Sequence, residues 1–530
     1  MQGFISRRWP LVAAVAVLWI TVAVLAILSI KQNGGNLVYA LDDAYIHMAM
    51  AKNFVQHGVW GITRHGFTSA SSSVLWTLLL AAVYYLFGVN EIAPLILNII
   101  FATLLLCAAY AILARHKTPL PPVYIFLTLL GITFITPVPT LIFSGMEHTL
   151  HTVLTVLFIY FSANLLSDNS SPLPASDTAV LLLPPFLVAA RYEGLFLVFA
   201  VSLLLMIRKR WIYAIGMGLL SIIPVGIYGI ISVKNGWYCL PNSILLKGHT
   251  PNPTVLKGLV KILGYTAYEQ ISANPHVLSL IALIIVLYIY RLISQKGFWG
   301  SGQLMAVIFL AGTLLHMNFA KTGWLFRYEA YLMACGLLVT AVLLSEIPPH
   351  GTQSKFIAIT AMAAAAILCV KPFAERAVNG AVQTPQAMND RYVEHIHLAR
   401  FVAQYYDNST IMVNDIGVLS FYTNVRILDI FGLGSMEPAV FRKRFTKPDT
   451  LAWARRMSAK VAILKTEWSD ITPRIPDEWD KVGKWRVPRN VVFEDNTTEF
   501  FAIDPSEKAA LAAHLRQFAP KLPNVVEQTL

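Results

Sequence analysis

Charged residues are scarce in this sequence. Asp, Glu, Lys and Arg make up 13% of its 530 residues, whereas 56% of the residues are hydrophobic. An ordinary soluble domain carries about a quarter charged residues. The shortage therefore excludes an ordinary soluble protein and favours a polytopic α-helical membrane protein.

Cysteine is scarce as well, and the few cysteines are scattered. Three of the four lie inside apolar runs, and their spacing matches neither a zinc site nor a disulfide framework. We therefore expect small core residues at Cys107, Cys239, Cys335 and Cys369.

Negative charge is also in short supply, which leaves a formal net charge of +12. Such a charge can indicate nucleic-acid binding. Here, however, much of the cationic excess near the apolar runs lies in short loops, where it orients membrane helices. We therefore expect no nucleic-acid partner.

Apolar runs near span length, by contrast, are frequent up to about residue 370. The first, Leu11 to Ile30, follows Arg7 and Arg8, which favour a cytoplasmic N-terminus. It is longer than a signal-peptide core, so we interpret it as a retained anchor in the bilayer.

The positive-inside rule decides the rest of the topology. It favours Val74 to Val89 lying along the outer surface, because the basic clusters Arg115–Lys117 and Arg208–Arg210 then face the cytoplasm. This assignment predicts about eleven spans and a C-terminus outside the membrane.

The composition changes near Lys371, after which no apolar run reaches span length. We therefore predict a transmembrane domain over residues 1–371 and an outer domain over residues 372–530. The outer domain has neither a Gly-x-Gly-x-x-Gly nor a Walker sequence, which argues against a nucleotide site. Its apolar patterns predict a helix over Arg391–Tyr406 and buried strands at Thr410–Asn414, Val425–Ile430 and Lys460–Leu464, hence an α/β domain.

Residues 41–90 form the first outer loop in this topology. The loop opens with Asp42 and Asp43, and the apolar residues that follow recur at helical spacing. This pattern predicts a juxtamembrane amphipathic helix. An acidic pair held against a membrane is costly unless it has a function. His47, His57 and His65 have no metal-like spacing with the aspartates, and we expect them at the interface or in solvent.

Other polar residues fall on the same outer side of the predicted membrane. A transporter would instead concentrate such groups near the bilayer midplane. The pattern thus indicates a reaction centre at the outer membrane boundary, with candidate residues Asp42, Asp43, Glu147, Arg191, Glu193, Asn242, Lys247 and Arg327.

The loop LDDAYIHMAMAKNFVQHG…FTSASSSVLW resembles the first outer loop of the GT-C superfamily of polyprenyl-phosphate-sugar glycosyltransferases. Within it, the likeness is to arabinofuranosyltransferases that take arabinose from decaprenyl phosphate, and to their bacterial relatives. The relatives usually carry Arg-Pro-Asp-Gly where this chain has Arg191-Tyr192-Glu193-Gly194, so both charges are kept. Further pieces match in order: SGMEHTL at Ser144–Leu150, ARYEG at Ala190–Gly194, LPNSILLK at Leu240–Lys247, FRYEAY at Phe326–Tyr331 and NDIGVLSFYTNVRILDIFGLGS at Asn414–Ser435.

The resemblance implies a GT-C fold. Such a fold has a membrane helical bundle, juxtamembrane helices in the first outer loop and a C-terminal periplasmic domain. It also implies a bacterial cytoplasmic (inner) membrane, with the active site on the periplasmic side.

A sugar transferred from a lipid phosphate needs a base for the acceptor hydroxyl and cations for the departing phosphate. We assign the base to Asp42, with Asp43 orienting it; the alternative is that the pair caps the surface helix. If a divalent cation is present, Asp43 and Glu147 are its candidate ligands. The candidate phosphate and substrate ligands are Arg191, Glu193, Asn242, Lys247 and Arg327.

For Arg191 and Arg327 the alternative is that they are snorkelling interfacial residues. In the outer domain, we expect Asp415 and Asp429 to end strands rather than to catalyse.

These points predict an inverting glycosyltransferase that moves a sugar from a polyprenyl-phosphate donor to an envelope glycan, lipid or protein. The resemblance suggests a pentofuranose as the sugar. Two alternatives remain: a lipid-linked-sugar flippase or envelope-glycan transporter, and an oligosaccharide polymerase or ligase with a pyrophosphate-linked donor.

Overall fold

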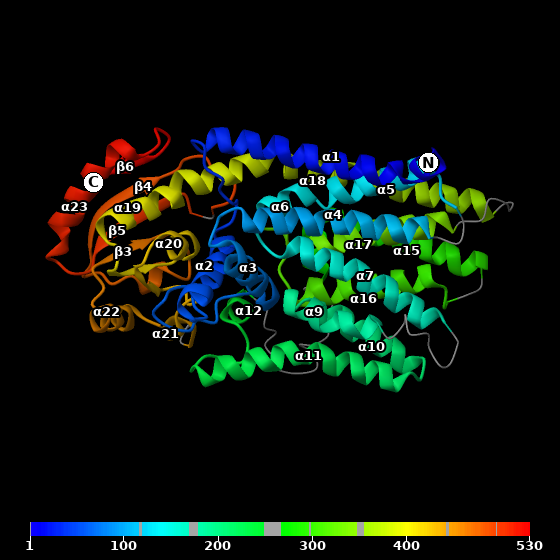
Figure 1. Cartoon of the computed structure of the whole chain (residues 1–530), viewed down its shortest axis with the longest axis horizontal. Helices are drawn as coiled ribbons and strands as arrows, with labels where there is room; N and C mark the ends of the chain where they lie inside the picture. The colour runs from blue at the N-terminus through cyan, green and yellow to red at the C-terminus, as the bar shows by residue number, and fades with distance from the viewer. Residues whose placement is uncertain are drawn as a thin grey trace.

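The computed structural model describes residues 2–115, 119–168, 179–247, 267–295, 298–346, 354–440, 445–493 and 495–530. A bundle of long helices fills one end of the molecule, and a sheet domain fills the other (Figure 1). Helices α2 (Asp42–His57), α3 (Val74–Phe87) and α12 (Asn242–Lys247) lie between the two. Two of the three residues of the predicted cytoplasmic cluster Arg115–Lys117, His116 and Lys117, lie outside the described residues.

Among the described residues, six helices are long and apolar enough to cross a membrane. Their length and composition agree with a polytopic membrane protein, but they do not settle the predicted number of about eleven spans, which stays a prediction. The six are α1 (Gln2–Gln32), α4 (Ala93–Ala114), α7 (His148–Ser167), α11 (Trp211–Lys234), α15 (Pro275–Gln295) and α16 (Ser301–Phe319). Shorter helices of the bundle are α5 (Pro122–Ile135), α6 (Val138–Phe143), α9 (Leu183–Ala190), α10 (Gly194–Ile207), α14 (Ala267–Ala273) and α17 (Ala330–Ser345).

Helix α7 is the most enclosed of the six. Buried residues make up 72% of its apolar window, but only 22% of that of α1 and 28% of that of α11. Helices α4, α16 and α17 pack around α7, which explains its burial. Because α7 begins at His148, the packing of the bundle also fixes the position of Glu147 directly before it.

One helix joins the bundle to the sheet domain. Helix α18 (Ser354–Arg391) runs through Lys371 without a break and continues into a π-helical turn at Tyr392–Ile396 and then α19 (His397–Tyr405). Figure 1 shows this run along the upper edge of the bundle into the sheet domain. The predicted division at residues 371 and 372 thus falls inside a helix, and it stays a prediction.

The sheet has six strands in the order β2-β1-β3-β5-β4-β6. Strands β1 (Thr410–Val413), β2 (Arg426–Asp429) and β3 (Val461–Leu464) are parallel and match the predicted strands closely. The antiparallel half, which the sequence analysis did not predict, comprises β4 (Asp480–Arg486), β5 (Thr497–Ala502) and β6 (Glu527–Thr529). The surrounding helices are α20 (Gly417–Tyr422), α21 (Met436–Val440), α22 (Lys447–Arg456) and α23 (Glu507–Phe518).

Both faces of the parallel strands are buried, as is usual for parallel sheets. Along β1, Ile411 and Val413 face a core that is continuous with the bundle, whereas Met412 faces a separate core. The second core contains Trp453 of α22. The sheet domain is therefore packed into the membrane part of the chain along one of its faces.

The first outer loop forms the predicted helix α2, which ends at Gly58 in a left-handed conformation (φ 66°). The helix is not exposed along a surface, because it packs between α3 and α20 and most of its residues are buried. His47 corrects our expectation of an interfacial histidine. It is 2% exposed, and its Nδ1 lies 3.0 Å from the Thr77 hydroxyl and 3.1 Å from that of Ser71.

Candidate active site

Two chambers meet where the bundle faces the sheet domain. The polar chamber, about 440 Å³, lies between the end of the bundle that faces the sheet domain and the carboxyl ends of the parallel strands. The apolar chamber, about 280 Å³, has mainly apolar walls, which include Leu195, Phe196 and Val225. Four residues line both chambers: Asp43, Lys321, Arg327 and Tyr328.

Arg327 is the centre of this shared wall. Its side chain is 2% exposed, and its Nη2 donates to Asp43 Oδ2 at 2.7 Å and to the Tyr328 hydroxyl at 3.0 Å. Its Nη1 contacts the thioether of Met146, a weak acceptor, and its Nε has no partner. The guanidinium thus retains donors that a phosphate oxygen would satisfy better. The alternative of a snorkelling Arg327 is wrong, because the side chain is buried.

A strained turn presents Arg327 to the chambers. Trp324, Leu325 and Phe326, immediately before it, have φ angles of 47°, 55° and 62°. Left-handed conformations cost about 1–2 kcal/mol for each residue with a side chain. Such strain persists only where the surroundings impose it, and it is common at functional sites.

A buried ion pair imposes this turn. Glu329 accepts from Gly323 N–H at 2.7 Å and from Arg376 Nη1 at 2.6 Å. Arg376, on α18, also donates to the Phe326 carbonyl at 2.8 Å. Glu329 and Arg376 therefore clamp both ends of the strained segment, and they are positioning residues for Arg327. The sequence analysis missed Arg376, since it lies in a helix and in no recognised motif.

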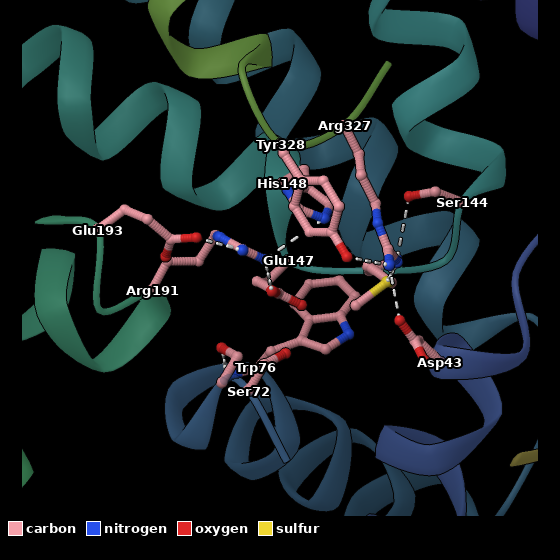
Figure 2. A network of polar contacts seen from close by, with 12 residues as sticks. Asp43, Ser72, Trp76, Ser144, Glu147, His148, Arg191, Glu193, Arg327 and Tyr328 are labelled. Atoms are coloured by element: carbon pink, nitrogen blue, oxygen red, sulfur yellow. Dashed lines mark hydrogen bonds and ion pairs between the residues drawn. The ribbon is translucent and has the colours of Figure 1, made fainter. Parts of the chain in front are cut away.

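Arg191 lies on the other side of the network, between two carboxylates. Its Nη1 donates to Glu147 Oε1 and its Nη2 to Glu193 Oε1, both at 2.6 Å (Figure 2). Arg191 is 5% exposed, so it does not snorkel. Burial raises the pKa of Glu193, but the charge and hydrogen bond of Arg191 lower it by more, to about 2. With two carboxylates beside it, Arg191 has less charge to offer a phosphate than Arg327.

Tyr328 separates the two arginines. The ring centroid lies 4.7 Å from the guanidinium carbon of Arg327 and 5.8 Å from that of Arg191, within the range of cation–π attraction. Figure 2 shows the ring between the two guanidinium groups. The sequence analysis quoted Tyr328 only as part of FRYEAY and assigned it no role.

Asp42 and its neighbour Asp43 have separate roles in the structure. Asp42 Oδ2 accepts from Gly417 N–H at 2.6 Å, and Oδ1 accepts from Val418 N–H at 2.9 Å. The carboxylate therefore binds the first amides of α20 in the sheet domain, rather than capping its own helix. Burial, followed by the nearby charge of Asp415, raises the pKa of Asp42.

Asn242, another predicted site residue, lines neither chamber. Asn242 donates from Nδ2 to the Gly432 carbonyl at 2.8 Å and from its backbone to Ser69, so it ties the outer loops to the sheet domain. Lys247 ends α12, but its side chain lies outside the described residues. Its predicted role in phosphate binding stays a prediction.

The donor set does not fit a divalent cation. Asp43 binds Arg327 and Glu147 binds Arg191, so each candidate ligand faces a guanidinium. Within the described ranges there is no group of three or more His, Cys, Asp or Glu residues placed to hold a metal ion.

The sequence analysis missed the sheet-domain wall of the polar chamber. Asp415, Phe431 and Lys465 directly follow or closely follow the three parallel strands, and all line this chamber. The sequence did carry a signal for this wall, because polar residues follow the predicted strands. The carboxyl ends of neighbouring parallel strands meet at one edge of a sheet and commonly bind ligands. Asp415 and Asp429 were expected to end strands, and both lie at strand ends.

Comparisons with known proteins agree with this architecture. Residues 385–501 match a family described as Domain of unknown function (DUF8728). No curated protein matches the chain. ArnT from Cupriavidus metallidurans in the apo state superimposes with a TM-score of 0.52 at 12% identity, over 93% of this chain and 99% of that one.

Two further solved structures are similar. ArnT bound to undecaprenyl phosphate gives a TM-score of 0.51 at 11% identity, over 93% of this chain and 98% of ArnT. The arabinofuranosyltransferase AftD from Mycobacteria gives 0.43 at 12% identity, over 94% of this chain and 41% of AftD. Because ArnT aligns over nearly the whole of both chains, the chain has the fold of ArnT.

Proposed function

We propose that this chain is an inverting glycosyltransferase that moves a sugar from a polyprenyl-phosphate donor to an envelope glycan, lipid or protein acceptor. The observation that carries the proposal is the Asp43–Arg327 ion pair in the wall shared by the two chambers. A base and a phosphate-binding cation are the two groups that this transfer requires, and here they touch.

The apolar chamber is the proposed donor site. Its apolar walls suit the first isoprene units of a polyprenyl chain, and Arg327 and Arg191 lie at its polar end. ArnT, which shares this fold, has been solved with undecaprenyl phosphate bound. We assign the phosphate first to Arg327, because it is paired with one carboxylate where Arg191 is paired with two.

Donor binding would also activate the base. Arg327 now shares its charge with Asp43, and a carboxylate beside a guanidinium is a weak base. A phosphate at Arg327 would compete for the same donors, and Arg is suited to bind phosphate oxygens in pairs. As Arg327 turns toward the phosphate, the Asp43 carboxylate becomes free to accept a proton.

Asp43 is a better candidate for the base than Asp42. Both oxygens of Asp42 accept backbone N–H groups of α20, whereas Asp43 lines both chambers and keeps a 22% exposed side chain. In the proposed step the acceptor oxygen attacks the anomeric carbon and gives its proton to Asp43. The bond from that carbon to the phosphate oxygen breaks, and polyprenyl phosphate leaves with the electron pair. A single displacement of this kind inverts the anomeric centre.

The test uses purified protein in liposomes with radiolabelled polyprenyl-phosphate sugars and a cell-envelope fraction as acceptor. A pentofuranose, which the sequence resemblance suggests, is the first donor to try. We expect label in the envelope fraction and release of polyprenyl phosphate, both abolished in Asp43→Asn. Movement of intact donor between leaflets without release would instead support the flippase alternative. Use of a pyrophosphate-linked donor alone would support the polymerase or ligase alternative.

The proposed location is the outer face of a bacterial cytoplasmic membrane, with the N-terminus in the cytoplasm and the sheet domain in the periplasm. The apolar helices support a membrane setting. The side on which each end lies rests on the positive-inside rule alone.

A further inference from the structure

The sheet domain presents a ligand-binding edge to the shared wall. Strands β1, β2 and β3 are parallel, and the segments after all three line the polar chamber. Ligands of open α/β sheets bind at the carboxyl ends of the strands, near the point where the strand order reverses. Here the chain goes from β1 outward to β2 and then back to β3 on the other side of β1.

Arg391 lies in this wall without a salt bridge to any carboxylate among the residues that the structure describes. It is 4% exposed and lines the polar chamber. Its Nη1 lies 2.8 Å from His395 Nε2, and within the described ranges its Nε has no partner. A buried guanidinium without a direct ion pair is costly, so an anionic ligand would stabilise this site.

The carboxylates around Arg391 have other hydrogen-bond or ion-pair partners. Asp390, next to it in the chain, accepts from Gln386 Nε2 and from Val491 N–H, both at 2.7 Å. Asp42 binds the amides of α20, Asp415 lies 2.9 Å from His395, and Glu394 accepts from Lys465 Nζ at 2.6 Å. Burial, with Arg391 as the next cause, lowers the pKa of His395 to about 3. A neutral imidazole cannot balance the guanidinium.

Aromatic side chains complete the wall. Phe493 lies 5.0 Å from the guanidinium carbon of Arg391, so this ring supports one face of the group. Trp468 also lines the chamber, and its Nε1 has no partner. Aromatic rings with nearby hydrogen-bond donors suit a sugar, whose C–H faces pack on rings while its hydroxyls accept bonds.

We propose that the sheet-domain wall of the polar chamber binds an anionic group, a carboxylate or a phosphate, carried by the sugar acceptor, and that Arg391 is its ligand. This inference rests on the proposed function and adds the chemical class of the acceptor. The bound anion forms a direct ion pair with Arg391 and places the acceptor in the chamber that Asp43 also lines.

The test measures binding without transfer, on the full-length protein in detergent. Saturation-transfer NMR titrations compare D-glucuronate and D-glucose 6-phosphate with neutral D-glucose. A hydrogen bond to a charged group contributes about 1.5–3 kcal/mol, so the preferred anion should bind about 10- to 100-fold more tightly than glucose. Preference for glucuronate alone assigns a carboxylate, and preference for glucose 6-phosphate alone assigns a phosphate. Equal binding of all three overturns the inference without any variant.

Variants then locate the site. Arg391→Gln should reduce anion affinity to that of glucose, and Arg391→Lys should restore part of it. The matched control is Arg400→Gln, on the exposed face of α19, which should leave the preference unchanged. An anion preference that survives in Arg391→Gln overturns the assignment of Arg391.

The two proposals fail separately. Asp43→Asn should abolish transfer while keeping the anion preference, because binding needs no base. Transfer by a wild-type protein that shows no anion preference would sink this inference alone. A wild-type protein that shows the anion preference but transfers no sugar would sink the proposed function alone.

Discussion

Replacing Asp42 and Asp43 separately by asparagine distinguishes a carboxylate that holds the fold from one that takes part in the reaction. The two residues are adjacent in the chain, but their oxygens have different partners. Asp42 binds Gly417 and Val418 of the sheet domain, and Asp43 binds Arg327 in the shared wall. The same chemical change should therefore have two different effects.

Asp43→Asn should lower turnover by about a hundred- to ten-thousand-fold, the usual effect of losing a general base, or about 2.7–5.5 kcal/mol in the barrier. Asparagine still offers an oxygen to Arg327, but without a negative charge it competes less with the donor phosphate for the guanidinium. Affinity for polyprenyl phosphate should therefore stay the same or rise. A loss of turnover with undiminished lipid binding is the signature of a base that also restrains the phosphate ligand.

Asp42→Asn should instead affect stability. The asparagine oxygen can accept one of the two N–H groups of α20, and its NH₂ then faces the other. One buried donor loses its partner, which costs about 1–3 kcal/mol. Turnover per folded molecule should change by no more than a few-fold, because Asp43 and Arg327 keep their contacts.

The assay combines single-turnover release of polyprenyl phosphate, lipid-binding titration and thermal unfolding for each variant, at a temperature where all are folded. The reasoning is refuted if Asp42→Asn abolishes turnover with unchanged stability while Asp43→Asn remains active. In that case Asp42 is the base, as the sequence alone suggested.

Four shorter predictions follow from other contacts. Arg327→Lys should raise the donor KM by about tenfold or more, since a lysine replaces the planar fork by a single point charge; an unchanged KM contradicts the phosphate assignment. Glu329→Gln should also raise the donor KM, by loosening the strained turn, without shifting the pH profile of kcat, as steady-state kinetics would show. Burial raises the pKa of Asp429 to about 6 from 3.8. Between these values the folded chain keeps a proton that the unfolded chain has lost, so the free energy of unfolding should fall as pH rises from about 4 to 6. In thermal unfolding measured across this range, Asp429→Asn should remove the part of this pH dependence that Asp429 causes. Cysteines at exposed Lys209 and Asn408, with Cys239 removed, should react with a membrane-impermeant reagent in spheroplasts only at Asn408, and labelling of both would contradict the topology.

Local patterns predicted the elements of this fold well. The three parallel strands and α2 lie within a few residues of their predicted positions, because apolar runs and helical periodicity are properties of short segments. The antiparallel strands were missed. β4 reads DKVGKWR, in which Val482 and Trp485 are the two large apolar residues, so it lacks the apolar run that marked the parallel strands.

The sequence predicted which charged residues come together, but not which of them contact one another. Asp43, Arg191, Glu193, Glu147 and Arg327 do meet in one network, as their common sidedness indicated. What one sequence could not show is which of two adjacent aspartates turns toward Arg327. That choice depends on α20, which lies more than three hundred residues away in sequence and offers its amides to Asp42.

The continuous helix α18 sets the distance between the turn that bears Arg327 and the sheet-domain wall of the polar chamber. Arg376, which clamps the turn bearing Arg327, and Arg391, in the sheet-domain wall, lie fifteen residues apart on this one helix, about 22 Å along its axis. One residue inserted between them would rotate Arg391 by about 100° around the helix and shift it by about 1.5 Å. Side chains in the sheet-domain wall can therefore vary to suit a new acceptor. The length of this helical segment cannot change, because an insertion or deletion would move Arg391 relative to Arg327.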